Sequence, residues 1–174
     1  TFILNGNTTL SRSCQNVGAC GAVSNAKIIA NKKLSISSYD LDGIEIICNN
    51  ETFINIRNFY NSAPSSCYNC KFTVNSQLIY KKEKPSSFSD TSSIKSSEIT
   101  IAANGKFYTN DTIGRNSNST SINYAAGAQI GFTDMDSYNG LWQATASGSY
   151  TTNVNTSFVM PPEFTKISET SPLP

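Results

Sequence analysis

The chain has 174 residues, which is enough for one domain with a hydrophobic core. Its formal net charge is +1 and 14% of its residues are charged, which argues against nucleic-acid binding, because such proteins carry a strong basic excess. No apolar run approaches the roughly 20 residues that cross a bilayer, so membrane insertion is not expected. Polarity comes from serine (26), asparagine (20) and threonine (17), a composition common in secreted β-proteins.

Short segments with alternating or β-branched apolar residues follow one another along the chain, and few windows have helical periodicity. Turn pairs such as Asp42-Gly43 and Asn104-Gly105 separate these segments. We therefore predict an all-β fold without an internal repeat, an antiparallel β-sandwich of jelly-roll or immunoglobulin-like type. The predicted strands are 26–30, 34–39, 43–48, 53–60, 71–80, 98–103, 106–109, 120–125, 128–133, 141–146 and 148–160.

The most loop-like segment is 81–97, which contains Pro85 and many serines. Its lysines, Lys81, Lys82 and Lys84, can be an anion-binding patch or the solvated charges of an exposed loop. We favour the solvated loop.

The chain contains five cysteines and no histidine. The CxxC motif at Cys67 and Cys70 lacks the second pair or the histidines of a zinc site, so disulfides in an oxidising compartment fit better. Cys48 ends a predicted strand on its buried side, and a bridge to Cys14 or Cys20 closes a loop of about 30 residues, worth roughly 3–4 kcal/mol. Cys67 and Cys70 can pair locally across their turn.

Catalytic motifs are scarce. Without histidine, the Ser-His-Asp and Cys-His arrangements are excluded. Glycine-rich phosphate loops are missing from the sequence, and few carboxylates are placed to act in pairs. We therefore predict no enzyme activity, no cofactor and no metal site.

The segment "TDMDSYNGLW", residues 133–142, is the predicted ligand-binding site. It places acidic, amide and aromatic groups in one turn between two strands: Asp134, Asp136, Tyr138, Asn139 and Trp142. Carboxylates and amides hydrogen-bond sugar hydroxyls, and aromatic rings pack against the apolar side of a pyranose. The pair Asp134-x-Asp136 also suggests calcium, but the later glutamate of an EF-hand loop is missing. The alternative is a hairpin loop with an Asn-Gly turn, whose Trp142 packs in the core.

Two features carry a resemblance to a known family. An early cysteine followed 35 to 40 residues later by one at a strand end, here Cys14 and Cys48, resembles the disulfide of chaperone–usher pilus subunits and their tip adhesins. The segment "SGSYTTNVNTSF", with Gly148 and Tyr150, is similar to the final strand of pilin-type domains. The resemblance implies a Cys14–Cys48 bridge and a receptor-binding domain at 1–160. It also implies that 161–174 is a linker towards a second, pilin domain.

The function that the resemblance implies is that of a fimbrial tip adhesin, extracellular at the tip of a fimbria. Its partners would be a host-cell glycan or glycoprotein and, through the second domain, other pilus subunits. The N-terminal "TFILNG" does not match the mannose-binding pocket of such adhesins, so no binding residues follow from the family. Two alternatives stay open: a structural pilus subunit that exposes a groove for a neighbour's strand, and a secreted carbohydrate-active enzyme or its binding module.

Overall fold

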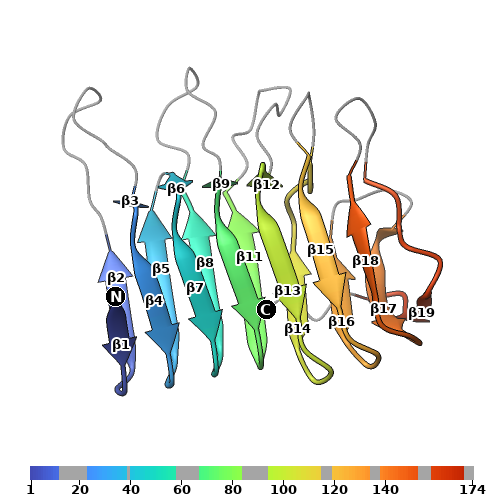
Figure 1. Cartoon of the computed structure of the whole chain (residues 1–174), viewed down its shortest axis with the longest axis horizontal. Coiled ribbons are helices and arrows are strands. Elements are labelled where there is room, and N and C mark those ends of the chain that lie inside the picture. Colours follow the sequence, from blue (N-terminus) through green and yellow to red (C-terminus); the bar gives the residue numbers. More distant parts are fainter. Residues whose placement is uncertain are drawn as a thin grey trace.

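The structure is a computed structural model that describes residues 1–11, 23–38, 40–57, 67–83, 94–114, 119–133, 138–152 and 158–170. Their regular structure consists of β-strands in three sheets, which we name A, B and C. Figure 1 shows these strands side by side along the long axis of the molecule, from β1 at the blue end to β17, β18 and β19 at the red end.

Sheets A and B form the two long walls, and sheet C is a narrow third wall. Sheet A contains β1 (Phe2–Leu4), β4 (Lys27–Ala30), β7 (Glu45–Cys48), β10 (Lys71–Val74), β13 (Glu98–Ile101), β15 (Ser121–Tyr124) and β18 (Gly148–Thr151). Sheet B contains β2 (Thr8–Ser11), β5 (Leu34–Ser38), β8 (Thr52–Ile56), β11 (Gln77–Lys82), β14 (Lys106–Thr109), β16 (Gln129–Phe132), β17 (Gly140–Ala144) and β19 (Phe164–Ser168). Sheet C contains β3 (Val23–Ser24), β6 (Leu41–Asp42), β9 (Cys67–Tyr68) and β12 (Ile94–Lys95).

The chain winds through the sheets in the order A, B, C and returns to sheet A one strand further along. Successive strands are parallel, as in β4–β7–β10 of sheet A and β5–β8–β11 of sheet B. Four consecutive turns carry a strand in all three sheets. The fold is therefore a parallel β-solenoid, and the predicted antiparallel sandwich of jelly-roll or immunoglobulin-like type is wrong.

The prediction failed on how the strands pair. Alternating apolar residues bury one face of a strand equally well in parallel and antiparallel sheets. The pairs Asp42-Gly43 and Asn104-Gly105 lie at corners where the chain passes from one sheet to the next. Corners and hairpin turns use the same residue types, so composition does not separate them.

Two predicted segments are cut differently by the structure. The predicted strand 71–80 breaks at Asn75 and Ser76 into β10 and β11, which belong to different sheets. Of the predicted strand 148–160, only β18 is a strand, while 153–157 lie outside the described residues.

The proposed linker 161–174 includes β19, which pairs antiparallel with β17. In the predicted loop 81–97, Lys81 and Lys82 end β11 and Lys84 lies outside the described residues.

The core is built from rows of inward side chains that stack from turn to turn. In sheet A one such row joins Ile28, Ile46, Phe72, Ile99 and Ile122, all 3% exposed or less. Parallel in-register pairing places equivalent residues about 4.8 Å apart, so each side chain packs on those above and below it. The first member of this row, Phe2, is 62% exposed because β1 is the edge strand of sheet A.

The corner between sheets C and A requires a left-handed residue at the same place in every turn. Asn25 (φ 53°), Gly43 (φ 62°), Asn69 (φ 52°) and Ser96 (φ 48°) each follow a strand of sheet C. Gly114 (φ 62°) continues the series after Ile113, which bridges to Ile94. Glycine adopts this conformation at no steric cost and asparagine tolerates it, which explains every residue of the series except Ser96.

An asparagine ladder joins the first four corners between sheets A and B. Asn31 Nδ2 donates to Asn5 Oδ1 at 2.8 Å, Asn49 Nδ2 to Asn31 Oδ1 at 2.8 Å, and Asn75 Nδ2 to Asn49 Oδ1 at 2.7 Å. Each amide inside such a ladder both donates and accepts, so it links the turns on either side.

We expect Asn49→Ala to destabilise the protein by about 1–2 kcal/mol, because it removes two side-chain hydrogen bonds worth about 0.5–1.5 kcal/mol each. The neighbouring Asn50 is also exposed, but its side chain accepts from Glu51 N, outside the ladder. Asn50→Ala should therefore cost at most about 0.5 kcal/mol. Urea unfolding of both variants measures the difference, and equal losses would show that the ladder adds nothing.

The C-terminal end of the solenoid is closed by antiparallel strands and aromatic rings. Strands β17 and β18 pair antiparallel with β16 and β15. Phe158 lies 5.4 Å from Phe132 and 5.9 Å from Tyr150, measured between ring centroids. On the same end Tyr124 and Phe164 meet edge to face at 4.7 Å. These contacts cover the last turn of the core.

Candidate binding groove

A polar groove of about 510 Å³ follows the corner where sheet C passes into sheet A. It is open to solvent, and neutral hydroxyl and amide groups dominate its lining. The described lining residues are Asn69, Cys70, Lys71, Ser96, Ser97, Glu98, Ser119, Ser121 and Thr151.

Stacking of the turns brings these residues together from distant parts of the sequence. Lys71, Glu98, Ser121 and Thr151 are register partners on four neighbouring strands of sheet A. The spacing between strands is about 4.8 Å, so this wall is about 14 Å long. That length accommodates a short oligosaccharide or an extended peptide.

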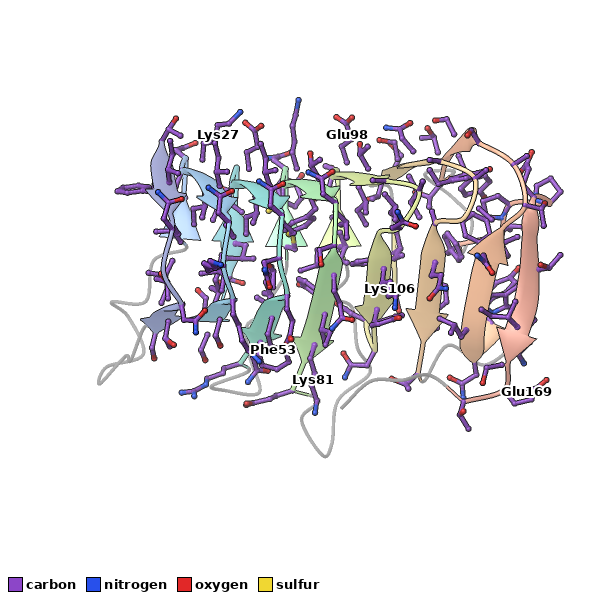
Figure 2. The ribbon with its side chains drawn as sticks, turned by 90° about the horizontal axis from the view of Figure 1, so that it is seen from below. Lys27, Phe53, Lys81, Glu98, Lys106 and Glu169 are labelled. Atoms are coloured by element: carbon purple, nitrogen blue, oxygen red, sulfur yellow. The ribbon has the colours of Figure 1, made fainter. Side chains whose placement is uncertain are left out.

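The wall carries one ion pair. Lys71 Nζ lies 3.8 Å from Glu98 Oε2, and their side chains are 67% and 43% exposed. The same row holds a second pair outside the groove, Lys27 and Glu45, whose Nζ and Oε1 atoms are 2.7 Å apart. Figure 2 shows Lys27 and Glu98 along the same outer edge. Exposed pairs of this kind add little to stability, so they can be altered without unfolding the protein.

Hydroxyl groups bonded to the main chain form the floor. Ser97 Oγ donates to Lys95 O at 2.7 Å and accepts from Cys70 N at 3.0 Å. Thr120, which stands between the lining residues Ser119 and Ser121 in the chain, is fully buried, and its Oγ1 donates to Ile94 O at 2.9 Å. Because these buried hydroxyls are satisfied, the floor is fixed before any ligand arrives.

The cysteines of the groove region are free thiols. The side chain of Cys67 lies in the core, and the residue is 0% exposed. Cys70, which lines the groove, is 1% exposed. Cys48 is also a free buried thiol, facing inward between Ala30 and Val74 of the adjacent strands. The structure therefore contains neither the predicted Cys67–Cys70 bridge nor a Cys14–Cys48 bridge, and Cys14 and Cys20 lie outside the described residues.

The three thiols have different acidities. Burial raises the pKa of Cys48 to about 12, against a hydrogen bond with Thr52 that lowers it. Burial also raises the pKa of Cys67 well above its usual range, and the hydrogen bond with Cys70 adds to this. The same hydrogen bond lowers the pKa of Cys70, and main-chain hydrogen bonds at Ile44 and Tyr68 act in the same direction against burial. Cys70 is therefore the more easily ionised member of its pair.

The predicted site at 133–142 is partly described. Asp134 and Asp136 lie outside the described residues, while Asn139 is exposed and Tyr138 and Trp142 are partly buried. Trp142 lies on β17 opposite Ile130 of β16, in an antiparallel pair. This is the hairpin that the alternative interpretation expected, and the binding role of these residues stays a prediction.

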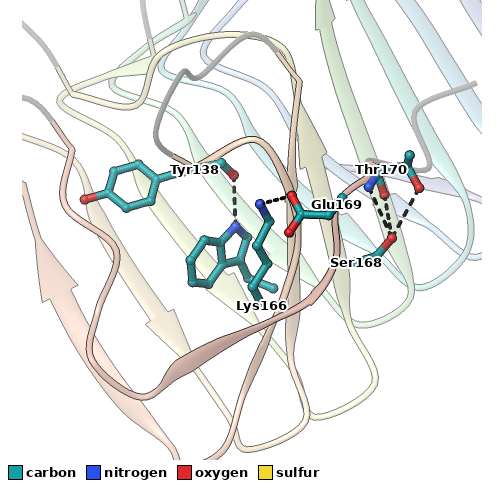
Figure 3. A network of polar contacts seen from close by, with 6 residues as sticks. Tyr138, Lys166, Ser168, Glu169 and Thr170 are labelled. Carbon is teal, nitrogen blue, oxygen red and sulfur yellow. Dashed lines mark hydrogen bonds and ion pairs between the residues drawn. The ribbon is translucent and has the colours of Figure 1, made fainter.

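The two aromatic rings of this segment are engaged within the protein. Trp142 Nε1 donates to Tyr138 O at 2.9 Å, and the two ring centroids are 6.1 Å apart. Lys166 Nζ lies 6.0 Å from the centre of the Trp142 ring and forms an ion pair with Glu169. Figure 3 shows this network next to Tyr138, with Ser168 and Thr170 beyond Glu169. One face of the indole is thus covered, which leaves less of it for stacking on a sugar.

Among the described residues no group of three or more histidine, cysteine, aspartate or glutamate side chains is arranged to hold a metal ion. The same part of the chain contains no helix with the length and apolar character of a membrane span. Comparison with protein-family models, with curated proteins and with solved structures finds no match to this chain.

The groove could not be predicted from the sequence, because its residues extend from 69 to 151 and meet only through stacking. One signal was present. Lys27, Glu45, Lys71 and Glu98 each stand two places after a left-handed corner residue, and their charges alternate in sign. Unlike charges on adjacent strands favour each other, so this alternation marks neighbouring positions of a parallel sheet.

Proposed function

We propose that this chain is a glycan-binding module that serves adhesion, with the groove between sheets C and A as its ligand site. The observation that carries the proposal is the continuous wall of hydroxyl and charged groups presented by Lys71, Glu98, Ser121 and Thr151. Sugars are recognised by polar groups of this kind when a rigid scaffold fixes their positions.

The solenoid supplies that rigidity. Every strand of the wall is hydrogen-bonded on both sides except β18, and the Ser97 hydroxyl that lines the groove is already bonded to the main chain. A ligand therefore meets groups that lose little conformational entropy on binding. The solenoid has no sandwich in which a neighbour's strand could complete the fold, so the structure gives no support to the structural pilus subunit or to the pilus context of the adhesin.

A binding role is favoured over hydrolysis by the carboxylates of the groove. Glu98 is the single carboxylate among the described lining residues, whereas most glycosidases use two on either side of the scissile bond. We keep a carbohydrate-active enzyme as the alternative that the following experiment also tests.

We expect Lys71→Ala and Glu98→Ala each to weaken glycan binding about 10- to 100-fold, because removing one polar interaction from such a site costs about 1–3 kcal/mol. The measurement is a glycan array followed by titration of the best ligand by calorimetry. The Lys71 side chain is 67% exposed and that of Glu98 is 43% exposed, so the unfolding temperature should change little.

Lys27→Ala is the matched control, because Lys27 has the same register position and an equivalent ion pair outside the groove. A loss of binding in Lys27→Ala equal to that in Lys71→Ala would contradict the proposal, as would an array on which the parent protein binds nothing. If Asn139→Ala abolishes binding and the groove variants do not, the ligand binds at 133–142. Release of new reducing ends from the bound glycan would establish the enzyme instead.

A further inference from the structure

The CxxC motif at Cys67 and Cys70 has a geometry that the proposed binding function does not use. Asn69, with φ 52°, turns the chain between the two cysteines so that both side chains point into the protein. A hydrogen bond between the two thiols shifts the pKa of each, and Cys70 Sγ also donates to Tyr68 O at 3.2 Å and to Leu41 O at 3.6 Å. Three residues apart and both turned inward at one corner, they are placed to form a disulfide without a rearrangement of the sheets.

We propose that Cys67 and Cys70 are a redox-active dithiol, in which Cys70 reacts first with a low-molecular-weight disulfide that enters through the groove and Cys67 then closes the intramolecular disulfide. The roles follow from position. Cys70 lines the groove with 1% of its surface exposed, whereas Cys67 does not line it and is 0% exposed. An attacking thiol needs access to its partner, and the second thiol needs access only to the first.

The pKa shifts of the two cysteines give the same order of reaction, with Cys70 first. A low pKa increases the thiolate fraction, which is the nucleophilic form, and Cys70 is the member whose pKa is lowered. The pKa of Cys67 is raised, so this thiol stays protonated until it reacts. Cys48, the third described cysteine, is buried with no cysteine among its described register partners, Ala30 and Val74.

The reaction balances with one equivalent of a disulfide RSSR. The Cys70 thiolate attacks one sulfur of RSSR, which forms a mixed disulfide on Cys70 and releases the first RS⁻. Cys67 gives up its proton and attacks the Sγ atom of Cys70, which forms the Cys67–Cys70 bond and releases the second thiolate. The two protons of the cysteines leave as two RSH, the two cysteines are oxidised, and RSSR accepts two electrons.

The test uses the reduced 174-residue chain and oxidised glutathione as the probe. Samples are quenched with a maleimide, digested with trypsin and weighed by mass spectrometry. Trypsin separates the cysteines into three peptides: 13–27 with Cys14 and Cys20, 34–57 with Cys48, and 58–71 with Cys67 and Cys70. We expect peptide 58–71 of the folded protein to become a disulfide with no maleimide bound, while Cys48 keeps its free thiol.

Two variants separate the roles of the cysteines. Cys67→Ser should trap glutathione on Cys70, because the second step is removed. Cys70→Ser should leave Cys67 unmodified over the same time, and circular dichroism checks that both variants are folded. Equal trapping in the two variants would overturn the assigned order.

The wild-type protein decides the matter even if a variant fails to fold. The proposal is wrong if peptide 58–71 stays a dithiol in the folded protein but oxidises in denaturant. It is also wrong if peptide 58–71 becomes linked to peptide 13–27, since Cys67 or Cys70 would then pair outside the motif. Glycan binding by the groove does not enter this readout, so the two proposals succeed or fail separately.

Discussion

Phe72→Ala should lower the free energy of unfolding by about 3–5 kcal/mol, the usual cost of removing a fully buried phenylalanine. Phe72 is 1% exposed at the centre of sheet A, with strands β7 and β13 on either side. Its ring also meets Tyr80 edge to face, with 6.5 Å between the ring centroids. Since a solenoid core is a stack, the cavity opens at one turn and weakens the packing of the turns above and below.

Phe2→Ala is the matched control, because Phe2 belongs to the same inward row but is 62% exposed on the edge strand. We expect this substitution to cost less than about 1 kcal/mol, in proportion to the area it withdraws from water. Guanidinium unfolding of both variants gives the comparison. If the two losses are similar, the row does not run through the core as the register requires.

The existence of strands could be predicted from local sequence, but their partners could not. Segments such as 34–39 and 106–109 coincide closely with β5 and β14. The residues that face inward also follow from alternation, which gives Ile54 and Ile99 their buried positions. Pairing direction depends on what each corner does to the path of the chain, and that information is not contained in a single strand.

A short repeat was present and escaped sequence analysis. The segments "SNAKIIA" (24–30), "DGIEIIC" (42–48), "YNCKFTV" (68–74) and "KSSEITI" (95–101) share a corner residue, a charge two places later and an alternating strand. Their spacing hides them. Strands of sheet A begin 18 residues apart between 27 and 45, but 27 residues apart between 71 and 98. Solenoid repeats are normally found by a fixed period, which this chain does not have.

The variation in length comes from one corner of the solenoid. The connections from sheet C to sheet A have the same length in all four turns, as between β6 and β7 or between β9 and β10. The connections from sheet B to sheet C differ in length, from the two residues 39–40 to the eleven residues 12–22. A solenoid tolerates insertions at one corner because the stacked strands on both sides keep their register. The same freedom prevented the candidate groove from being predicted, since its residues have no constant separation in sequence.

Gly105→Ala should destabilise the protein by about 3 kcal/mol, at the upper end of what overpacking costs. A Cβ atom at Gly105 would lie 2.2 Å from Val74 O, a main-chain atom that accepts from Ala102 N at 3.0 Å. That hydrogen bond joins two successive turns at the corner between sheets A and B. Relieving the clash means separating the turns and breaking the bond, and no flexible side chain can move aside instead.

Gly6 provides the control at the equivalent corner of the first turn. A Cβ atom there meets nothing within 4 Å, so Gly6→Ala should change stability by less than about 1 kcal/mol. Both variants replace glycine by alanine, so their effects on the entropy of the unfolded chain nearly cancel. The difference between them in thermal and urea unfolding therefore measures how closely the turns approach each other. A fold with the same strands in a sandwich has no stacked corner next to Gly105, and in that fold the two alanines would have similar effects. A large and selective loss at Gly105 follows only from turns stacked at the spacing of a parallel sheet.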